Sequence, residues 1–290
     1  MPTTLADDVT AWYARAARDL PWRAPDAGPW AVLVSEVMLQ QTPVRRVLPA
    51  YEAWLRRWPT PAALAADEPG EAVRAWGKLG YPRRALRLHA CARTIVAEHG
   101  GAVPLELDDL LALPGVGSYT ARAVAAFAFG LRHPVVDTNV RRVVARAVHG
   151  RGEAGPPATG RDLAEATALL PADAAEAVRF SVAMMELGAL VCTARAPRCG
   201  ECPLVDRCAW HAAGRPDYAG PRPRPQRFAG TDRQVRGLLL DVLRGHTTPV
   251  TRAALDAVRA EPVQRERALA ALIADGLIEP LPDGRFALPG

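Results

Sequence analysis

Four clustered cysteines constrain this chain more than any other feature of its sequence. Cys192, Cys199, Cys202 and Cys208 follow the pattern C-x6-C-x2-C-x5-C within VCTARAPRCGECPLVDRC. Four thiolates this close can surround one metal centre, so the segment is predicted to fold around it. The spacing fits a structural zinc ion and a 4Fe-4S cluster equally, and the central CxxC makes a chance arrangement the weakest alternative.

The apolar residues from about residue 5 to 213 recur with a helical period that Pro and Gly interrupt, and alternating strand patterns are almost absent. This pattern predicts an all-α fold, and 290 residues with 49% apolar side chains can build a core. The fifth cysteine, Cys91, is isolated on a helical pattern, so we expect a small buried apolar side chain without a role.

The C-terminal part of the chain is predicted to be a separate small module. Residues 214–230 are rich in Pro, Gly and Arg, which is the composition of a linker. Residues 231–290 contain three helical patterns and a hairpin turned by Pro282, Asp283 and Gly284. Three helices and a hairpin suggest a winged-helix-like module.

The charge and the N-terminal segment bear on partners and location. The formal net charge is +5 and nearly all basic residues are arginines, because Lys78 is the only lysine; this gives mild support for nucleic-acid binding. The N-terminal 20 residues mix acids with apolar residues and contain no continuous apolar run, which predicts neither a signal peptide nor a membrane span. We therefore expect a cytoplasmic protein, in which clustered cysteines bind metal more readily than they form disulfides.

The uncharged stretch LPGVGSYTA (residues 113–121) lies between two helical patterns. Its glycines, Gly115 and Gly117, permit backbone conformations closed to other residues, and a helix starting near Ser118 would present free amides. With Val116 these residues are predicted to bind a DNA phosphate without reading the base sequence. An ordinary corner between two helices is the alternative, and the flanking patterns favour a helix-hairpin-helix over it.

Two carboxylates occur where chemistry is plausible. Glu36 interrupts the apolar helical segment PWAVLVSEVMLQQT, where burial would raise its pKa and let it act as a general acid; a structural glutamate is an even alternative. Gln40 lies one helical turn after Glu36 and can reach the same cleft. Asp137 precedes NVRRVVARAV at a typical N-cap position, and capping does not exclude stabilisation of a developing positive charge.

These motifs together, with VDTNVRRV, resemble the iron-sulfur helix-hairpin-helix DNA glycosylases, most closely the MutY-type adenine DNA glycosylases, over roughly residues 8–212. The resemblance implies a two-lobed core with a 4Fe-4S cluster loop. It also implies a cluster domain of residues 1–29 and 138–213, a helical domain of residues 30–137, a linker (214–230) and the module (231–290). The expected partner is double-stranded DNA with A:8-oxoguanine or A:G mispairs, bound by a nucleoid-associated monomer.

The family's reaction flips a base out of the duplex and hydrolyses its N-glycosidic bond. The resemblance implies that Glu36 protonates adenine N7 and helps to activate water, that Asp137 stabilises the sugar cation, and that Tyr119 and Asn139 support these carboxylates. It further implies DNA-binding roles for other positions: Gln41, Thr42 and Tyr81 wedge into the base stack, and Trp22 and Arg23 line the base pocket.

Departures from the family pattern leave alternatives open. The chain has VDTNV for VDGNV and GYPRR for GYYxR, and it lacks the pattern of a C-terminal NUDIX-like domain that recognises 8-oxoguanine. An endonuclease III-like glycosylase and lyase is one alternative, although it needs a lysine where Tyr119 stands. A non-catalytic zinc-containing DNA-binding protein is another. For the C-terminal module, a packing role and extra duplex contact are equally compatible with the sequence.

Overall fold

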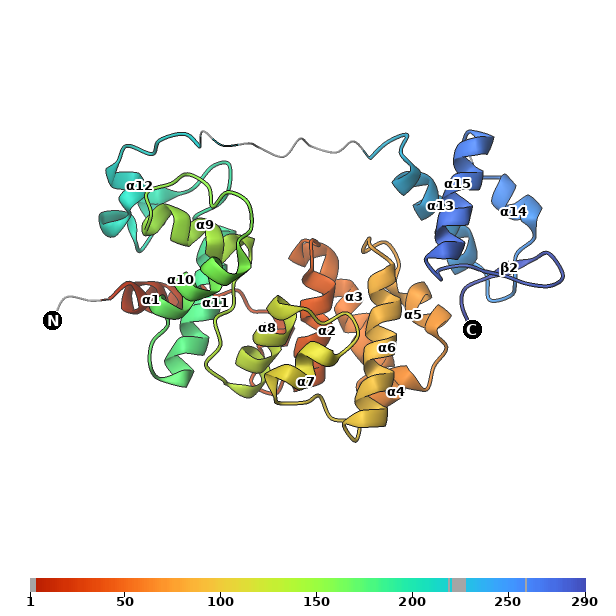
Figure 1. Cartoon of the computed structure of the whole chain (residues 1–290), viewed down its shortest axis with the longest axis horizontal. Coiled ribbons are helices and arrows are strands. Elements are labelled where there is room, and N and C mark those ends of the chain that lie inside the picture. The colour runs from red at the N-terminus through yellow and green to blue at the C-terminus, as the bar shows by residue number, and fades with distance from the viewer. Residues whose placement is uncertain (1–3, 219, 221–227, 259) are drawn as a thin grey trace. The chain divides into compact units, whose positions relative to one another are not determined.

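The structure, a computed structural model, describes residues 4–218, 220, 228–258 and 260–290, and its regular elements are almost entirely helical (Figure 1). It divides into two compact units. The described part of the first comprises residues 4–32, 105–107, 117–218 and 220, and that of the second comprises residues 33–104, 108–116, 228–258 and 260–290. Residues 219 and 221–227 of the predicted linker lie outside the described residues.

The predicted all-helical pattern over residues 5–213 is confirmed by the observed elements. The helices of the first unit are α1 (Leu5–Ala16), α8 (Ser118–Phe129), α9 (Thr138–Ala147), α10 (Thr159–Leu169), α11 (Ala174–Leu190) and α12 (Ala209–Ala212), with short 3₁₀ helices at Pro21–Arg23, Cys199–Glu201 and Val205–Arg207. Those of the second are α3 (Val44–Arg57), α4 (Pro61–Ala65), α5 (Pro69–Trp76), α6 (Arg83–Glu98), α13 (Asp232–Arg244), α14 (Arg252–Asp256) and α15 (Pro262–Ala274), followed by strands β1 (Glu279–Pro280) and β2 (Phe286–Ala287). Two helices, α2 (Pro29–Leu39) and α7 (Leu107–Ala112), contain residues of both units. Within the described chain, no helix has both the length and the apolar character needed to cross a bilayer.

The core of the first unit forms where α1, α9 and α11 pack together. In α9, Val140, Val143, Val144 and Ala147 follow the i, i+3, i+4, i+7 spacing that places apolar side chains on one helical face. All four are buried in the same cluster as Leu187 of α11. This packing fixes the start of α9, where Asp137 and Asn139 lie, and the end of α11, which leads into the cysteine loop.

The second unit has a core rich in tryptophan. Trp54 of α3 contacts Trp58 and Trp76 edge to face, with ring centroids 4.6 and 5.6 Å apart. Such aromatic pairs add to the apolar area that they bury. Helix α6 packs against α4 and α5, so the loop between α5 and α6 joins two helices that are packed together.

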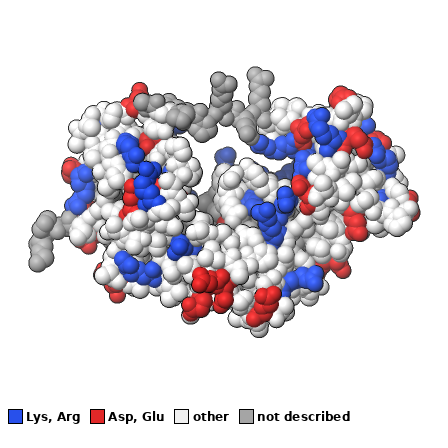
Figure 2. Space-filling model, viewed as in Figure 1, with Lys and Arg blue, Asp and Glu red and all other residues white. Residues whose placement is uncertain are grey.

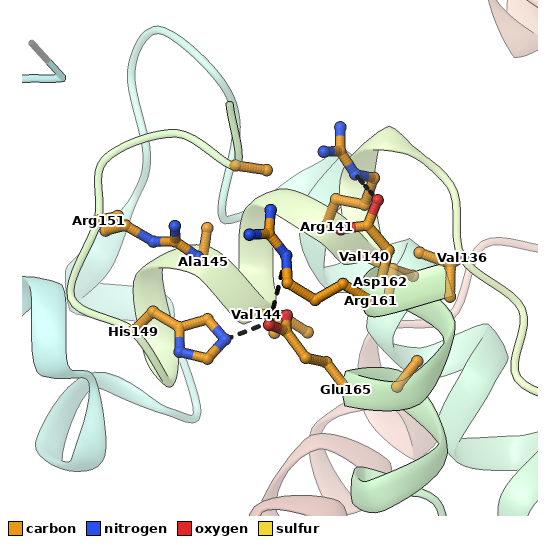
Figure 3. Close-up of a pocket in the computed structure, with 12 residues that line it drawn as sticks. Val136, Val140, Arg141, Val144, Ala145, His149, Arg151, Arg161, Asp162 and Glu165 are labelled. Atoms are coloured by element: carbon orange, nitrogen blue, oxygen red, sulfur yellow. Dashed lines mark hydrogen bonds and ion pairs between the residues drawn. The ribbon is translucent and has the colours of Figure 1, made fainter. Parts of the chain in front are cut away.

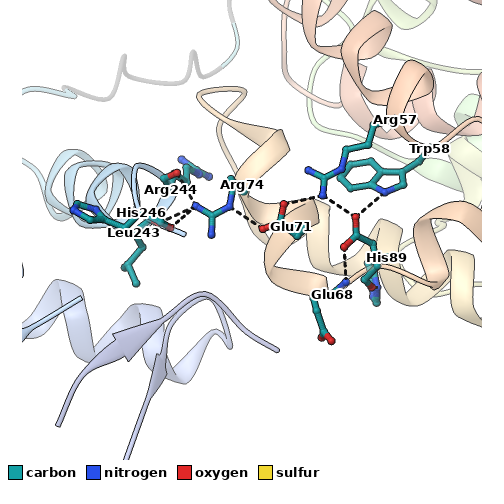
Figure 4. A network of polar contacts seen from close by, with 10 residues as sticks. Arg57, Trp58, Glu68, Glu71, Arg74, His89, Leu243, Arg244 and His246 are labelled. Carbon is teal, nitrogen blue, oxygen red and sulfur yellow. Dashed lines mark hydrogen bonds and ion pairs between the residues drawn. The ribbon is translucent and has the colours of Figure 1, made fainter. Parts of the chain in front are cut away.

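The C-terminal helices pack on α5 through backbone and side-chain contacts (Figure 4). Arg74 of α5 donates from Nη1 to the carbonyl oxygens of Leu243, Arg244 and His246, at 3.1, 2.7 and 2.7 Å, which satisfies the open end of α13. At the other end of α5 the amide of Gly70 donates to the carbonyl oxygen of Pro289 (2.7 Å). A Cβ at position 70 would lie 2.5 Å from that oxygen, so the approach requires glycine.

The predicted hairpin is present at the end of the chain. Strands β1 and β2 pair antiparallel with Glu279 opposite Ala287, and Gly284 in the turn has a φ of 78°. The side chain of Lys78, between α5 and α6, is 85% exposed and forms an ion pair with Asp241 of α13 at 3.4 Å. The module and the α5–α6 loop therefore belong to one packed unit.

Candidate functional site

The four clustered cysteines line one pocket in the first unit, together with Arg146, Pro197 and Trp210. None of them is in a disulfide. Helix α11 ends two residues before Cys192, and the two 3₁₀ helices that follow turn the chain so that the other three cysteines face the same space. A four-iron cluster takes one thiolate per iron, so its ligands surround a pocket and need not meet at one point.

The surroundings of these cysteines fit a negatively charged iron-sulfur cluster. Arg146 donates from Nη1 to Cys192 Sγ at 3.5 Å, and its guanidinium lies 4.6 Å from the ring centroid of Trp210. Burial raises the pKa of the Cys192 thiol, whereas the hydrogen bond from Arg146 favours the thiolate. Burial likewise raises the pKa of Cys202 to about 11, so the free thiol is protonated and cluster binding would release its proton.

Asp137 is the N-cap residue of α9, as predicted. Its Oδ1 accepts a hydrogen bond from the amide of Val140 (2.8 Å), and its Oδ2 accepts one from Asn139 Nδ2 (2.7 Å). Burial raises the pKa of Asp137, while these hydrogen bonds and the charge of Arg142 act in the opposite direction. The structure thus brings Asp137 and Asn139 together and holds the carboxylate in a fixed orientation.

Arg142 links this carboxylate to the cysteine loop. Its Nη2 donates to Asn139 Oδ1 and to the carbonyl oxygen of Gly188, both at 2.7 Å. Its Nε donates to the carbonyl oxygen of Cys192 at 2.7 Å. A continuous chain of hydrogen bonds therefore runs from Asp137 through Asn139 and Arg142 to the first cysteine.

Gly188 is needed for this arrangement because a Cβ at that position would lie 2.6 Å from the Cβ of Asn139. We expect Gly188→Ala to push α9 and α11 apart and to lower the free energy of unfolding by about 2 kcal/mol. The measurement is urea unfolding followed by circular dichroism. The control is Gly160→Ala in α10, where a Cβ would meet open space, and helix propensity there favours alanine by about 0.5–1 kcal/mol. Equal stability of the two variants would contradict the assignment of Gly188.

Glu36 lies in α2, which runs from Pro29 to Leu39 and whose residues from Val32 to Met38 are all buried. Glu36 itself is 4% exposed, in agreement with the predicted buried carboxylate. We expected Gln40 to continue α2, but the helix ends at Leu39. The carbonyl oxygen of Gln40 accepts a hydrogen bond from Arg84 Nη1 (2.7 Å). Glu36 belongs to the second unit and Asp137 to the first.

The glycine hairpin has the predicted form, with α7 and α8 joined by residues 113–117. Gly115 has a φ of 79°, and a Cβ there would lie 2.8 Å from the Cβ of Arg87. Gly117 is the N-cap of α8, and the amide of Val116 donates to the carbonyl oxygen of Leu113 (3.1 Å). Tyr119, in the first turn of α8, packs against a small core cluster that contains Ala123, Ala126 and Val135.

Trp22 and Arg23 lie on the 3₁₀ helix Pro21–Arg23, and Trp22 is buried. Glu186 of α11, which is fully buried, accepts from Arg23 Nη2 at 2.9 Å and from Arg18 Nε and Nη2 at 2.8 and 2.7 Å. The carboxylate of Glu186 therefore fixes the segment that carries both predicted pocket residues.

Glu186 predicts a pH dependence of stability. Burial alone would raise its pKa, but hydrogen bonds from Arg18 and Arg23 outweigh burial and lower it from 4.5 to about 2. A lowered carboxylate pKa stabilises the fold above pH 4.5, and this stabilisation is lost as the pH falls towards 2. At about 1.4 kcal/mol per pH unit it amounts to about 3 kcal/mol at neutral pH.

We expect Glu186→Gln to lower the free energy of unfolding by about 3 kcal/mol at pH 7 and to flatten its decline between pH 4.5 and 2. Denaturant unfolding across this pH range measures both effects. The control is Glu266→Gln, which removes an exposed partner of Arg252 and should cost less than about 1 kcal/mol. An unchanged pH profile in Glu186→Gln would contradict the role given to Glu186.

Of the three predicted wedge residues, Gln41 and Tyr81 are exposed, and Tyr81 is 52% accessible. Thr42 is buried; its hydroxyl accepts a hydrogen bond from Arg84 Nη2 (2.9 Å) and donates to the carbonyl oxygen of Leu79 (3.3 Å). Thr42 therefore holds its loop in place in the DNA-free chain.

A separate pocket lies between α9 and α10 (Figure 3). Several polar side chains that line it contact one another: Arg141 and Asp162 at 2.8 Å, and His149 and Glu165 at 3.1 Å. None of the predicted site residues lines it. We assign no function to this pocket.

Sequence reasoning missed Glu186, Arg142, Gly188 and Arg84. The signal for Glu186 was present, because it interrupts the apolar segment SVAMMELGALV in the same way as Glu36 interrupts α2. The two arginines and the glycine carry no comparable local signal. Cys91, predicted to be buried, is 1% exposed, and burial raises its pKa to about 12.

Comparison with known proteins gives family matches over the helical core and the cysteine loop. Residues 34–168 match the HhH-GPD superfamily of base excision DNA repair proteins, and residues 192–208 match the iron-sulfur binding domain of endonuclease III. The chain is 60% identical to an adenine DNA glycosylase of Mycobacterium tuberculosis over 100% of its own length and 95% of that protein. It is 61% identical to the adenine DNA glycosylase of Mycolicibacterium smegmatis, over 98% of this chain and 95% of that one. A solved structure of a thermostable thymine-DNA glycosylase superposes with a TM-score of 0.65 and 26% identity, covering 72% of this chain and 95% of the other.

Proposed function

The chain belongs to the adenine DNA glycosylases of base excision repair, hydrolases of N-glycosyl bonds, and from this premise we propose that it removes adenine opposite 8-oxoguanine or guanine without cutting the strand. Its substrate is DNA, and its four clustered cysteines form a 4Fe-4S binding domain. We further propose that the domains follow the predicted boundaries and that the protein acts as a cytoplasmic, nucleoid-associated monomer.

The lysine content carries the proposal that the reaction stops at base removal. A lyase step needs an amine that attacks the sugar and forms a Schiff base. Tyr119 stands at the position that a lysine occupies in the endonuclease III-like lyases that this chain resembles. The only lysine of the chain, Lys78, lies in the second unit, where it forms an ion pair with Asp241. No lysine side chain is therefore available at the start of α8.

In the proposed reaction, protonated Glu36 donates its proton to N7 of the extruded adenine. The C1′–N9 bond then breaks, its electron pair leaves with adenine, and Asp137 stabilises the oxocarbenium-like sugar. Water adds to C1′ and returns a proton to Glu36. The contacts from Asn139 and Val140 support this role for Asp137, because they hold the carboxylate in one orientation.

The DNA contacts are proposed to come from both units. Gly115, Val116 and Gly117 hold a phosphate at the start of α8. Gln41, Thr42 and Tyr81 wedge into the base stack, and Gln40 reaches the same cleft as Glu36. Trp22 and Arg23 line the adenine pocket, and Tyr119 supports the two carboxylates. The fixed orientation that Glu186 gives to Arg23 supports this assignment.

A panel of duplexes tests the proposed function. Purified protein is incubated with duplexes containing A:8-oxoguanine, A:G, A:C or an oxidised pyrimidine, and strand breaks are scored with and without alkali. We expect breaks only after alkali and only for the adenine mispairs. Breaks without alkali, or a covalent enzyme–DNA adduct trapped by borohydride, would overturn the assignment as a glycosylase without lyase activity.

For the C-terminal residues 231–290 we propose a winged-helix-like module that packs on α5 and does not read the duplex. Its arginines pair with acids of the same module: Arg267 with Asp232 at 2.6 Å, and Arg265 with Asp256 at 3.2 Å. Figure 2 shows basic and acidic side chains interspersed over these helices. A surface of this kind gives little attraction for phosphate.

We expect Arg267→Gln to leave the dissociation constant for an A:G duplex, and its dependence on salt, within about twofold of the wild-type values. Fluorescence anisotropy at several salt concentrations measures both. A weaker dependence on salt, with lower affinity, would favour the alternative that the module contacts DNA.

A further inference from the structure

The two exposed residues proposed to enter the duplex share an unusual backbone conformation. Gln41 has a φ of 56° and Tyr81 a φ of 48°, and neither is glycine. Only one other non-glycine residue in the described part of the chain, Arg215, has a positive φ. Side chains disfavour this left-handed region, so it persists where neighbouring contacts impose it, and it recurs at functional sites.

Arg84, in the first turn of α6, imposes the conformation at Gln41. Its Nη1 donates to the carbonyl oxygens of Val37, Met38 and Gln40 at 2.8, 3.1 and 2.7 Å. The last carbonyls of a helix have no partner within the helix, and a cation is favoured there. By binding two of them and the carbonyl oxygen of Gln40, the guanidinium ends α2 and fixes the peptide just before Gln41.

The second terminal nitrogen of the same guanidinium, Nη2, holds the segment before Tyr81. Arg84 Nη2 donates to the carbonyl oxygen of Gly80 (3.0 Å) and to Thr42 Oγ1 (2.9 Å). The Thr42 hydroxyl in turn donates to the carbonyl oxygen of Leu79 (3.3 Å). The guanidinium also lies 5.4 Å from the centroid of the Tyr81 ring. One side chain thus bonds the residues on both sides of Gln41 and the residue before Tyr81.

Arg84 keeps its charge although it is only 6% exposed. Burial lowers its pKa to about 10, so it stays protonated at neutral pH, and no carboxylate among the described residues pairs with it. Its Nε is buried without a hydrogen-bond partner. The guanidinium carbon lies 5.2 Å from the ring centroid of Trp76. A buried charge without a counter-ion destabilises a fold, and an apolar side chain would pack at this position at a lower free-energy cost. The five hydrogen bonds are therefore what Arg84 provides and an apolar side chain could not.

We propose that Arg84 is a positioning residue that holds Gln41 and Tyr81 in the conformations from which they enter the DNA, so that extrusion of adenine depends on this one guanidinium. The proposal rests on the proposed function, because it concerns the same reaction. A lysine at this position cannot reproduce it, since an ammonium lacks the planar fork that serves two sets of acceptors.

The test compares two duplexes in single-turnover excision with saturating enzyme. In the first, adenine pairs with guanine, so its extrusion requires the stack to be opened. In the second, adenine lies opposite a tetrahydrofuran abasic analogue, where the opposing base is already missing and less unstacking is needed. We expect Arg84→Lys to lose about a hundredfold in rate on the first duplex, the loss typical of small misplacements, and less than about threefold on the second. The matched control is Arg93→Lys, an exposed position of the same helix, which should match the wild type on both.

A double-mutant cycle separates positioning from general destabilisation. Tyr81→Ala removes one of the two side chains through which Arg84 is proposed to act, so adding Arg84→Lys to it should cost much less than Arg84→Lys costs alone. Independent effects that multiply would overturn the proposal. So would equal losses on the two duplexes.

A second variant covers the case in which Arg84→Lys fails to fold, judged by its melting temperature and iron content. Thr42→Val removes the acceptor of one Nη2 bond and keeps the shape of the side chain, and we expect it to lose rate selectively on the A:G duplex. A wild-type protein inactive on every adenine duplex would overturn the proposed function and this inference with it. An active wild type with an unimpaired Arg84→Lys variant would overturn this inference alone.

Discussion

Glu36→Gln is expected to abolish adenine excision while DNA binding is retained. Glutamine has the size and hydrogen-bonding capacity of the glutamic acid but no proton to transfer, and the buried position of Glu36 in α2 leaves little room for water to replace it. We expect the single-turnover rate on an A:8-oxoguanine duplex to fall by about a thousandfold or more, within the range attributed to general acid–base catalysis. Gel-based excision assays measure the rate, and anisotropy measures the affinity.

The matched control for this variant is Glu52→Gln, an exposed glutamate on α3 in the same unit. It should retain the full rate. A fully active Glu36→Gln protein would show that Glu36 is structural, the alternative that its sequence context left open. A loss of duplex affinity in step with the rate would show that Glu36 acts in binding.

Asp137→Asn is expected to have the second-largest effect. Asparagine caps a helix as well as aspartate does, so α9 should still begin at Thr138. The charge that faces the sugar cation is lost, and we expect the excision rate to fall by about a hundredfold to a thousandfold. The free energy of unfolding should change by less than about 1 kcal/mol, because removing a buried charge offsets the weakened contact with Asn139.

The pH dependence of excision gives a second readout for Asp137. Its pKa is raised above the ordinary 3.8, chiefly by burial. The ionised form is the active one in the proposed mechanism, so the rate should fall as the pH drops through this raised pKa, and the acid limb should lie above pH 3.8. The raised pKa also means that the ionised group opposes folding at neutral pH. An Asp137→Asn variant that keeps the wild-type rate at pH 7 would refute the electrostatic role.

Features with a local physical cause could be predicted from the sequence. The N-cap at Asp137, the start of α8 after Gly117 and the turn at Gly284 each depend on a few neighbouring residues. The cysteine spacing pointed to one metal centre for the same reason, because the ligands come from 17 consecutive residues. The mostly helical core followed from periodicity, which is strong in long segments.

Contacts between distant parts of the chain could not be predicted in this way. Glu186 binds Arg18, 168 residues earlier, and Arg84 binds the end of α2 across more than 40 residues. Neither pairing leaves a trace in local periodicity. The left-handed backbone at Gln41 is also invisible locally, because nothing in QQT favours it and the hydrogen bonds that impose it come from α6. The residues proposed to react could therefore be identified from the sequence. The residues that hold them in position could be identified only from the tertiary structure.

The solitary, 85% exposed side chain of Lys78 makes this protein unusually simple to label. Amine-reactive dyes would couple to a single side chain, the N-terminal amine being the other reactive group, and no engineered cysteine would be needed to compete with the cluster ligands. Lys78 stands three residues before Tyr81, so a dye attached there would lie beside the loop proposed to enter the base stack. Stopped-flow fluorescence from that dye would follow strand opening in real time, separately from the release of adenine.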